Sequence, residues 1–476
     1  MSDLLPDARY LVLASRLVPD RDGGFTISVL RRALDMADAG AEPLLLTIDP
    51  GESTDHDADR AEWVRRGLLA DPAGLRNLFD DARTDPSWLR SAALPGPVPT
   101  SEWPYRAIVD ASGRTVLELP VISGDPAWHL SDAPVRIWGE QGPVGWLPGF
   151  GGLYRAWLDA LAAAGAPRPE APADASAATG VGVGTVAPVV LLCEARQVGE
   201  ALVAPGAPAL DPGIRILHTT HACHVVAPFA WDSPMDAAWE RWFAVADRFD
   251  GVLWLTRSQQ ADVERRLGSG IRSSVVPHPA PRPSGAEPDP VPGRILVLNS
   301  LIPRKRVDHA IRALATLRRT VPEAHLHIYG DGAQRGELEA LAEELGVSDA
   351  VELRGHTADT SRAWAEADVF VLASTNEGQP LVVLEALGAG VPVVSYDMPY
   401  GPRDTLALGG GVLVADGDAE ALAAALGEVI ADRALRARLS SEGRTAALTM
   451  DAASSMRALG AAVRVALDEP VERIGR

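Results

Sequence analysis

Two glutamates near the end of the chain stand on either side of the start of an expected helix. Glu377 and Glu385 lie in EGQPLVVLEALGAGVPVVSYDMPYGP, where Pro380 suits a first helical position because it has no N–H to leave unsatisfied. At 1.5 Å per residue, Glu385 lies roughly 7 Å further along the helix axis than Pro380. Two carboxylates so displaced can bind different hydroxyl groups of one elongated ligand, with the free amides from Gly378 to Leu381 left for a phosphate. A nucleotide sugar has this arrangement of groups. Taken without the neighbouring motifs, both glutamates would be surface residues of a helix.

A basic cluster precedes another expected helix in LVLNSLIPRKRVDHAI, which has the pattern of strand, loop and helix. Its members are Arg304, Lys305 and Arg306, a local concentration of positive charge in a chain of net charge −20. An ammonium group at a strand-to-helix turn suits a diphosphate, with Lys305 best placed for it. The alternative is a solvated basic loop.

Two glycine turns also follow expected strands. Gly23 and Gly24 open a helix in RDGGFTISVL, where a ligand could approach the backbone closely. Gly330, Asp331 and Gly332 repeat this design in HIYGDGAQRG. Both motifs are also compatible with plain tight turns.

Three histidines end a further strand in ILHTTHACH. A metal site is the less favoured interpretation, because regularly spaced histidines converge only on a common helical face. A histidine that lines a cleft is favoured, with His221 as first choice and His218 as second, and a buried structural histidine is the remaining alternative. His224 completes the set. We expect no bound metal.

The elements that carry these motifs alternate. From residue 286 to 445, strands and helices follow one another at the spacing of a parallel sheet covered by helices, a doubly wound Rossmann-like domain. Residues 1–285 show the same pattern less regularly and form the expected N-terminal, acceptor-side domain. Residues 446–476 are expected to form a C-terminal helix that packs back on that domain. Because open α/β sheets bind ligands beyond the carboxyl ends of their strands, two such domains should face a cleft.

Part of the N-terminal half differs in kind. Two Gly-bearing turns between β-rich runs predict a small antiparallel insertion at about 95–150. Residues 60–92 are predicted to be helical. The Ala/Pro-rich stretch 166–180 is predicted to be a flexible loop, and the proline-rich stretch 277–293 to be the linker between the domains.

Composition limits the function classes. The 476 residues suggest two or three domains, and the net charge of −20 argues against nucleic acid as a partner. No apolar run could span a bilayer and no export signal is visible, so at most peripheral membrane contact and a cytoplasmic location are expected. Two cysteines, Cys193 and Cys223, fit a reducing compartment.

Taken together, these residues resemble the retaining glycosyltransferases of family 4, which have the GT-B fold. The resemblance is strongest over about 290–430, and extends less clearly over 8–50 and 186–278. Within the family the sequence is most similar to the bacterial subgroup that adds α-linked sugars to wall teichoic acids or serine-rich proteins. The features that suggest this subgroup are YGP at 400–402, the glycine pair after the first strand and the β-rich insertion.

The resemblance implies a role for each site residue. Glu377, His221 and Lys305 would be the catalytic residues, with Glu377 and His221 at the donor sugar and Lys305 at the departing diphosphate. The donor-binding residues would be Gly23, Gly24, Arg304, Lys305, Gly330, Asp331, Gly332, Gly378, Gln379, Pro380, Leu381 and Glu385. Glu385 would hold the ribose. One departure matters: the family commonly has an arginine five residues before the lysine, and Ser300 occupies that position. Either Arg304 or Arg306 replaces it, or Lys305 works alone with the helix amides.

The expected activity is transfer of a hexose or N-acetylhexosamine from a UDP-sugar, with retention, to a hydroxyl of a cell-wall polymer, protein or glycolipid. No cofactor is expected, since the nucleotide sugar is a co-substrate. The alternative is a catalytically silent partner that binds glycans or chaperones an active transferase. A nicotinamide-dependent oxidoreductase is disfavoured because no G-x-G-x-x-G follows the first strand. Homo-oligomers through the insertion are a further expectation. Six tryptophans near the insertion could stack on sugars, although core or oligomer packing is their commoner use: Trp88, Trp103, Trp128, Trp138, Trp146 and Trp157.

Overall fold

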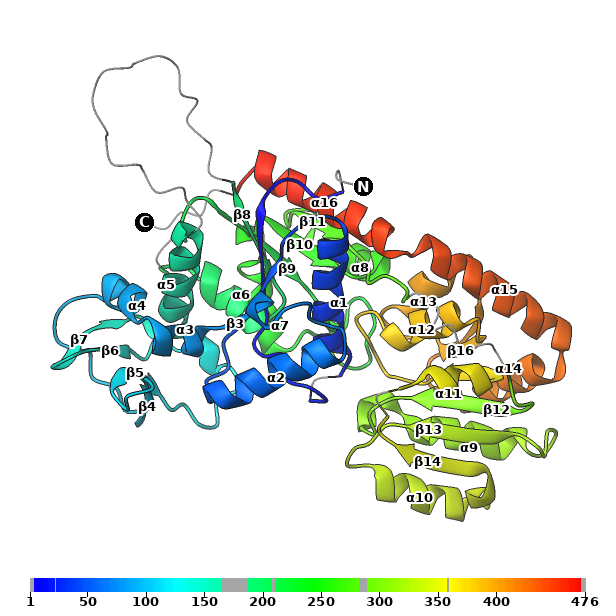
Figure 1. Cartoon of the computed structure of the whole chain (residues 1–476). Helices are drawn as coiled ribbons and strands as arrows, with labels where there is room; N and C mark the ends of the chain where they lie inside the picture. The colour runs from blue at the N-terminus through cyan, green and yellow to red at the C-terminus, as the bar shows by residue number, and fades with distance from the viewer. Residues whose placement is uncertain are drawn as a thin grey trace.

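The computed structural model shows two α/β domains side by side, joined near the C-terminus by long helices (Figure 1). The predicted loop at 166–180 and the predicted domain boundary at 285/286 lie outside the described residues, as does the middle of the predicted linker. The structure describes residues 4–21, 23–164, 187–207, 210–281, 289–357 and 359–471.

The N-terminal domain is built on a seven-stranded parallel sheet with the strand order β11-β10-β9-β8-β1-β2-β3. Its central strands are apolar runs buried on both faces; in β8 all five residues are buried. The strands are β1 (Arg9–Leu13), β2 (Leu44–Thr47), β3 (Leu75–Asn77), β8 (Val189–Cys193), β9 (Ile214–Thr219), β10 (Gly251–Trp254) and β11 (Ser273–Val275).

Alternate residues of β1 enter separate cores on the two faces of this sheet. Tyr10 and Val12 pack with α1 and α16, whereas Leu11 and Leu13 pack with α3, α5, α6 and α7. The helices of this domain are α1 (Gly24–Asp38), α2 (Ser53–Arg65), α3 (Leu78–Thr84), α4 (Ser87–Ala92), α5 (Gly149–Ala164), α6 (Arg196–Val203), α7 (Ala237–Phe243) and α8 (Arg257–Leu267).

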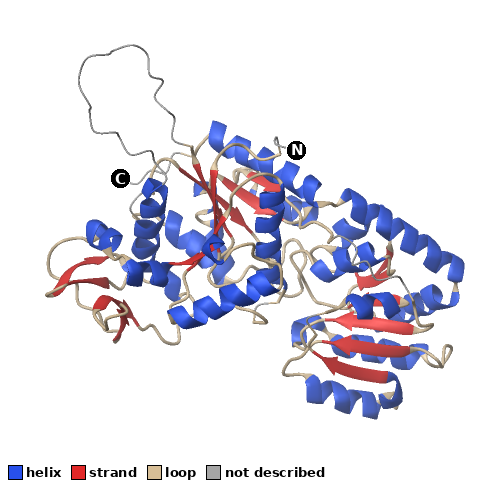
Figure 2. Cartoon of the chain, viewed as in Figure 1, coloured by secondary structure: helices blue, strands red, loops and turns tan. Residues whose placement is uncertain are grey.

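A four-stranded antiparallel sheet forms the insertion, which confirms the prediction from the Gly-bearing turns (Figure 2). It consists of two hairpins, and the turn between them carries the short 3-10 helix η2 (Trp128–Leu130). The strands are β4 (Tyr105–Val109), β5 (Thr115–Pro120), β6 (Val135–Gly139) and β7 (Gly142–Leu147).

The C-terminal domain has a six-stranded parallel sheet of order β14-β13-β12-β15-β16-β17. The strands are β12 (Arg294–Leu298), β13 (His325–Tyr329), β14 (Val351–Gly355), β15 (Val369–Leu372), β16 (Val393–Tyr396) and β17 (Gly411–Val414). The helices are α9 (Val307–Leu317), α10 (Arg335–Glu344), α11 (Ser361–Glu366), α12 (Leu381–Ala389), α13 (Pro402–Thr405), α14 (Ala419–Ala431) and α15 (Arg433–Thr449).

The last helix, α16 (Ala452–Asp468), belongs to the core of the other domain. Met456, Leu459 and Val463 are buried in the same cluster as Tyr10 and Val12 of β1. Figure 1 shows α15 along the C-terminal domain and α16, in red, continuing over the N-terminal one. None of the described helices is both long and apolar enough to cross a membrane.

One prediction about the N-terminal half was wrong in part. Residues 60–92 were predicted to be helical, but Leu75–Asn77 form the edge strand β3, paired in parallel with β2. The segment LRN is too short for a period-two pattern to emerge from its sequence, so pairing with β2 decides its conformation. The remaining short 3-10 helices are η1 (Pro72–Gly74), η3 (Ala246–Arg248), η4 (Pro303–Lys305), η5 (Ser348–Ala350) and η6 (Leu406–Leu408).

Candidate active site

Glu377 lies in the loop between β15 and α12 and is only 8% exposed. Its backbone N–H donates to the carbonyl of Pro399 at 3.0 Å, and its own carbonyl accepts the N–H of Tyr400 at 3.0 Å. The turn TNEGQP is therefore tied to the loop that follows β16, so the carboxylate has a fixed position.

The Glu377 carboxylate is held between two cations. Oε1 accepts from Lys305 Nζ at 2.6 Å, and Oε2 accepts from Arg304 Nη1 at 3.0 Å. Burial by itself would raise the pKa of Glu377, but the charges of Lys305 and Arg304 lower it below the ordinary value. The groups meet because β12 and β15 are neighbouring strands, so the loops at their carboxyl ends adjoin.

Arg304 and Arg306 have different surroundings. Arg306 donates to the backbone carbonyls of Ala373 and Ser374 at 2.7 and 2.6 Å and pairs with Asp416. Only Arg304 of these two makes a contact with Glu377 among the described residues. Of the two candidates to replace the missing arginine at Ser300, Arg304 is therefore the one beside the carboxylate.

Glu385, on the second turn of α12, faces the other domain. Its Oε1 lies 3.4 Å from Nη1 of Arg31, which is on α1. Burial raises the pKa of Glu385, and the charge of Arg31 opposes that rise. Arg31 could not be predicted as a site residue, because nothing in the sequence of α1 indicates a partner 354 positions away. A cavity of about 410 Å³ between the domains has Arg31, Leu381 and the segment 278–281 in its lining.

The glycine turns occupy tight places in the structure. Gly330 and Gly332 have φ of 137° and 157°, and a Cβ on either would collide with the backbone of the loop that leads to Lys305. Asp331 is exposed, and its carboxylate accepts the N–H of Gly332 at 2.8 Å. This turn therefore supports the lysine loop, and only glycine fits its backbone.

At the other turn, Gly23 has φ of 50° and precedes α1. Gly24 begins the helix, and a Cβ there would lie 3.7 Å from Leu381 Cδ1 at the start of α12. The amino ends of α1 and α12 thus approach each other across the domain interface.

His221 follows β9 and is bound to a carboxylate that was not among the predicted site residues. Its Nε2 lies 2.6 Å from Oε2 of Glu194, which comes directly after β8, and β8 and β9 are neighbours. The Glu194 side chain is fully buried and also accepts from Arg32 Nη1 at 2.6 Å. Burial would raise the pKa of Glu194, yet Arg32 and His221 hold it well below its ordinary range. A carboxylate directly after the buried run VVLLC was the signal available in the sequence.

The other two histidines are buried among aromatic side chains, and His218 lines the same cavity as His221. His218 packs against the rings of Trp242 and Phe249, and burial lowers its pKa to about 3. His224 stacks on Tyr400 at 5.8 Å, and burial lowers its pKa to about 4. Among the described residues, no group of three or more His, Cys, Asp or Glu side chains could hold a metal ion.

The loop that carries Glu377 is docked on the N-terminal domain. A Cβ on Gly378 would collide with the carbonyl oxygen of His221, so the two loops touch through their backbones. Gln379 Oε1 accepts the backbone N–H of His278 at 2.7 Å, and the Tyr400 hydroxyl donates to Asp262 at 3.0 Å. These contacts place the loop of Glu377 against that of His221, although their sequence positions are far apart.

A cavity of about 460 Å³ extends from His221 into the N-terminal domain, beside α6, α7 and η2. We call it the N-terminal cavity. It is lined by Ser15, Phe25, Trp128, His129, Glu194, Ala195, Arg196, Gln197, Val198, His218, Thr219, Thr220, His221, Ala222 and Trp239.

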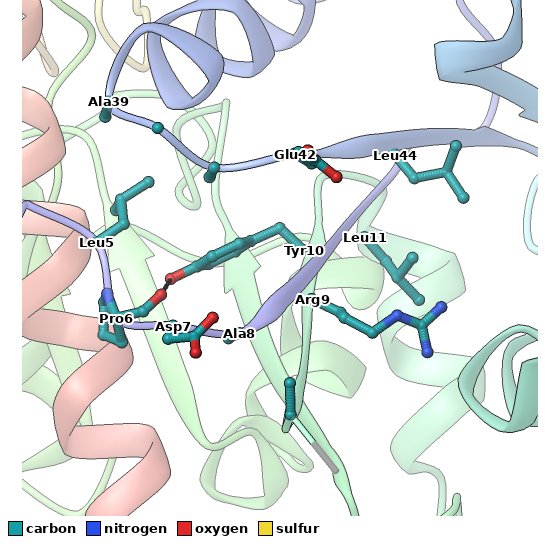
Figure 3. Close-up of a pocket in the computed structure, with 13 residues that line it drawn as sticks. Leu5, Pro6, Asp7, Ala8, Arg9, Tyr10, Leu11, Ala39, Glu42 and Leu44 are labelled. Atoms are coloured by element: carbon teal, nitrogen blue, oxygen red, sulfur yellow. Dashed lines mark hydrogen bonds between the residues drawn. The ribbon is translucent and has the colours of Figure 1, made fainter. Parts of the chain in front are cut away.

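Another cavity, of about 600 Å³, lies at the amino ends of the strands of the N-terminal sheet, on the side opposite to the candidate site. It surrounds the amino ends of β1 and β2, where the Tyr10 hydroxyl donates to the Pro6 carbonyl at 2.8 Å (Figure 3). None of the predicted site residues lines it. Ligands of open α/β sheets bind at the carboxyl ends of the strands, so this edge is not the candidate site.

Parts of the chain are similar in sequence to known proteins. Residues 287–446, the C-terminal domain, match the family model for Glycosyl transferases group 1. The chain is 37% identical over 195 residues to an exopolysaccharide phosphotransferase of Streptomyces coelicolor, covering 40% of this chain and 20% of that protein. It is 31% identical over 167 residues to the UDP-N-acetylglucosamine–peptide N-acetylglucosaminyltransferase GtfA subunit of Streptococcus gordonii, covering 33% and 32% of the two chains.

A third relative, the poly(glycerol-phosphate) alpha-glucosyltransferase of Bacillus subtilis, is 26% identical over 204 residues, or 42% of this chain and 30% of that protein. The chain thus spans less than half the length of each of these curated relatives.

Solved structures match along nearly the whole chain. TarM superposes with a TM-score of 0.70 at 14% identity, covering 97% of this chain and 99% of that one. The pneumococcal O-GlcNAc transferase GtfA, in complex with UDP and GlcNAc, gives 0.69 at 13% identity, covering 96% and 99%. The fold is GT-B, with two Rossmann-like domains and an antiparallel insertion, as the sequence predicted.

Proposed function

We propose that the protein is a retaining glycosyltransferase of family 4 that transfers a hexose or N-acetylhexosamine from a UDP-sugar to a hydroxyl acceptor. The observation that carries this proposal is the Glu377 carboxylate, fixed between Lys305 and Arg304 beside the amino end of α12. Cations and free helix amides at one place suit a diphosphate, and the carboxylates of Glu377 and Glu385 suit hydroxyl groups on either side of it.

In this proposal the donor replaces contacts that the site makes within itself. Lys305 and Arg304 turn from Glu377 to the diphosphate, and Glu377 accepts a hydroxyl of the sugar. The Glu385 carboxylate gives up its contact with Arg31 and accepts hydrogen bonds from the ribose hydroxyls. His221 lies by the sugar, and Gln379 and Leu381 contribute the loop and the helix start that hold the phosphates.

The reaction breaks the bond between the anomeric carbon and the diphosphate oxygen and forms one from that carbon to the acceptor oxygen. Lys305, Arg304 and the amides of α12 stabilise the charge that develops on the diphosphate, and the contacts between the two domains position the reactants. The acceptor proton leaves with the diphosphate or to solvent. No cofactor is required in this scheme, because these groups stabilise the leaving group.

The acceptor is proposed to be a cell-wall polymer, protein or glycolipid at the cytoplasmic side. The names of the Bacillus subtilis and Streptococcus gordonii relatives, which act on poly(glycerol-phosphate) and peptide, support this range. Oligomerisation through the insertion stays a prediction.

Calorimetry with UDP, followed by a panel of nucleotide sugars assayed for nucleotide release, tests the proposal. We expect UDP to bind and at least one UDP-sugar to be turned over. Folded protein that binds no nucleotide would instead support a catalytically silent partner. A product in which the transferred sugar has the opposite anomeric configuration to the donor would contradict the retaining mechanism.

A further inference from the structure

The amino end of α8 contacts both halves of the candidate site. Gln259, in the first turn of this helix, is fully buried, and its side-chain amide donates to the carbonyl of Ala222 at 2.9 Å. Ala222 directly follows His221, so this bond holds the loop that carries His221. The residue before Gln259 is Ser258, and it contacts the other domain. Two adjacent residues of one helix therefore support loops that belong to different domains.

The contact with the C-terminal domain is made by Asp404, which lies on α13. Its Oδ1 accepts the backbone N–H of Ser258 at 3.0 Å, and its Oδ2 accepts the hydroxyl of the same serine. The N-cap residue of α8, Thr256, accepts a different N–H, that of Gln259, at 3.3 Å. The first N–H groups of a helix have no partner within the helix. The amino end of α8 therefore has two capping side chains, one from each domain.

Asp404 also supplies a charge that the sequence of α8 lacks. The first turn of α8 contains no acidic residue, and its last turn contains Arg265 and Arg266. A negative charge at the amino end of a helix is favourable because of the helix dipole. Hydrogen bonds to a carboxylate are also stronger than those between neutral groups. The contact therefore favours an ionised carboxylate at position 404.

Asp404 is connected to Glu377 by residues 397–405, which we call the docking segment. Within this segment the carbonyl of Pro399 accepts the N–H of Glu377 at 3.0 Å, and the N–H of Tyr400 donates to the carbonyl of Glu377 at 3.0 Å. Figure 1 shows α13, at the end of the segment, next to α8. The docking segment therefore binds the loop of Glu377 at one end and the N-terminal domain at the other.

Tyr400 attaches the docking segment to the N-terminal domain a second time. Its side chain is 2% exposed and packs in a small cluster with Cys223 and Val225, which follow β9. Its hydroxyl donates to Asp262 at 3.0 Å. Asp262 lies four positions after Ser258, so both contacts are made by one face of α8.

We propose that the amino end of α8 sets the position of Glu377 relative to His221, and that Asp404 is a positioning residue for this purpose. The inference rests on the proposed function, in which both side chains lie at the donor sugar. Asp404 touches no reactant and acts through the docking segment. A displacement of a reacting group by about 1 Å can lower a rate about 100-fold, so a support shared by both loops affects kcat. The groups assigned to the diphosphate, Lys305, Arg304 and the amides of α12, lie in one domain, so UDP binding should change little when this support is lost.

Asp404→Asn tests this inference by separating rate from binding. We expect kcat for transfer to fall about tenfold, and the Kd for UDP to change by less than about twofold. Asp397→Asn is the matched control, because Asp397 belongs to the docking segment but pairs with Arg403 of the same segment. It should leave both constants unchanged. An unchanged kcat in Asp404→Asn, or a loss of UDP affinity as large as the loss of kcat, would overturn the proposal.

Hydrogen exchange of the ligand-free, full-length protein tests the same inference without transfer. Ser258→Ala removes a hydroxyl from the N-terminal domain, yet the amides of the Glu377 loop, in the other domain, should exchange about threefold faster or more. Ser91→Ala is the control, because the Ser91 hydroxyl donates to the carbonyl of Ser87 within α4, and it should leave these amides unchanged. Faster exchange confined to α8 would show that Asp404 is only a helix cap, which contradicts the proposal. If UDP does not bind, the proposed function fails, and the exchange of the Glu377 loop then decides this inference by itself.

Discussion

His221 Nε2 and Glu194 Oε2 lie 2.6 Å apart and join the carboxyl ends of two neighbouring parallel strands. Glu194 is already paired with Arg32, so its negative charge is balanced before the histidine is counted. The Nε2–H that Glu194 accepts leaves Nδ1 of His221 for a ligand. Glu194 thus acts as a positioning residue for His221.

We expect Glu194→Gln to lower kcat about 10- to 100-fold, because the imidazole loses the anion that orients it. Stability should fall by about 3 kcal/mol, since Arg32 keeps a buried charge without its partner. Initial rates over a pH series and thermal unfolding measure the two effects. Glu194→Asp should restore part of kcat. Glu200→Gln, at a buried carboxylate paired with Arg241, is the control and should leave the pH profile of kcat unchanged.

Glu377→Gln should lower transfer at least about 100-fold while the protein stays folded, because glutamine keeps the shape but not the charge between Lys305 and Arg304. Nucleotide release and the unfolding midpoint are the measurements. Glu366→Gln is the matched control, since that carboxylate also lies between two arginines, Arg294 and Arg362, outside the site. Near-normal turnover in Glu377→Gln would show that this carboxylate has no part in the reaction.

Two neighbouring arginines should respond differently to the same substitution. Arg304→Gln should reduce kcat about tenfold or more with little loss of stability, because its side chain is 42% exposed and contacts Glu377. Arg306→Gln should lower stability by about 1–3 kcal/mol, since it removes two hydrogen bonds to backbone carbonyls and the pair with Asp416. Rates and urea unfolding of both variants check this. A large loss of kcat in Arg306→Gln, with only a loss of stability in Arg304→Gln, would mean that Arg306 replaces the arginine that the family has at the position of Ser300.

The backbone contact between Gly378 and His221 gives a steric prediction. Gly378→Ala should lower kcat about 100-fold, because a Cβ forces the loop of Glu377 away from the His221 carbonyl by a fraction of an ångström or more. Gly336→Ala, in α10 and with open space around it, is the control and should be neutral or slightly stabilising. The values of kcat for both variants at saturating donor test this prediction. A fully active Gly378→Ala enzyme would mean that catalysis does not require the close contact between the loops of Gly378 and His221.

His56 predicts how stability depends on pH. Its ring lies 2.9 Å from Asp80 and 3.2 Å from Asp49. Burial would lower its pKa, but hydrogen bonds to these two carboxylates raise it to about 9. The unfolded pKa is about 6.5, so the stabilisation is complete below that pH and is lost as pH rises through about 9. We expect about 1–2 kcal/mol after solvent screening. Denaturant unfolding at a pH below about 6.5 and at a pH above about 9 measures this loss of stability. In His56→Gln the loss of stability between the two pH values should be smaller by the same 1–2 kcal/mol, about the contribution of the histidine.

Much of the architecture could be predicted from local pattern. Strand and helix alternate after residue 286 with a period that admits only a parallel sheet covered by helices, and the Gly-bearing turns predict the hairpins of the insertion. The motif residues Glu377, Lys305 and His221 could be selected because each follows an apolar strand, and strand ends in parallel sheets share one edge. The strand β3 was missed because its three residues take their conformation from β2.

The partners of those residues were decided by tertiary structure alone. The choice between Arg304 and Arg306 depends on the turn of η4, and the pairing of Glu385 with Arg31 depends on how the two domains dock. Glu194 reaches His221 only because the strand order places β8 beside β9. The physical reason is range: hydrophobic periodicity acts over a few residues and sets each element, whereas a contact between distant positions depends on how complete sheets and domains pack together.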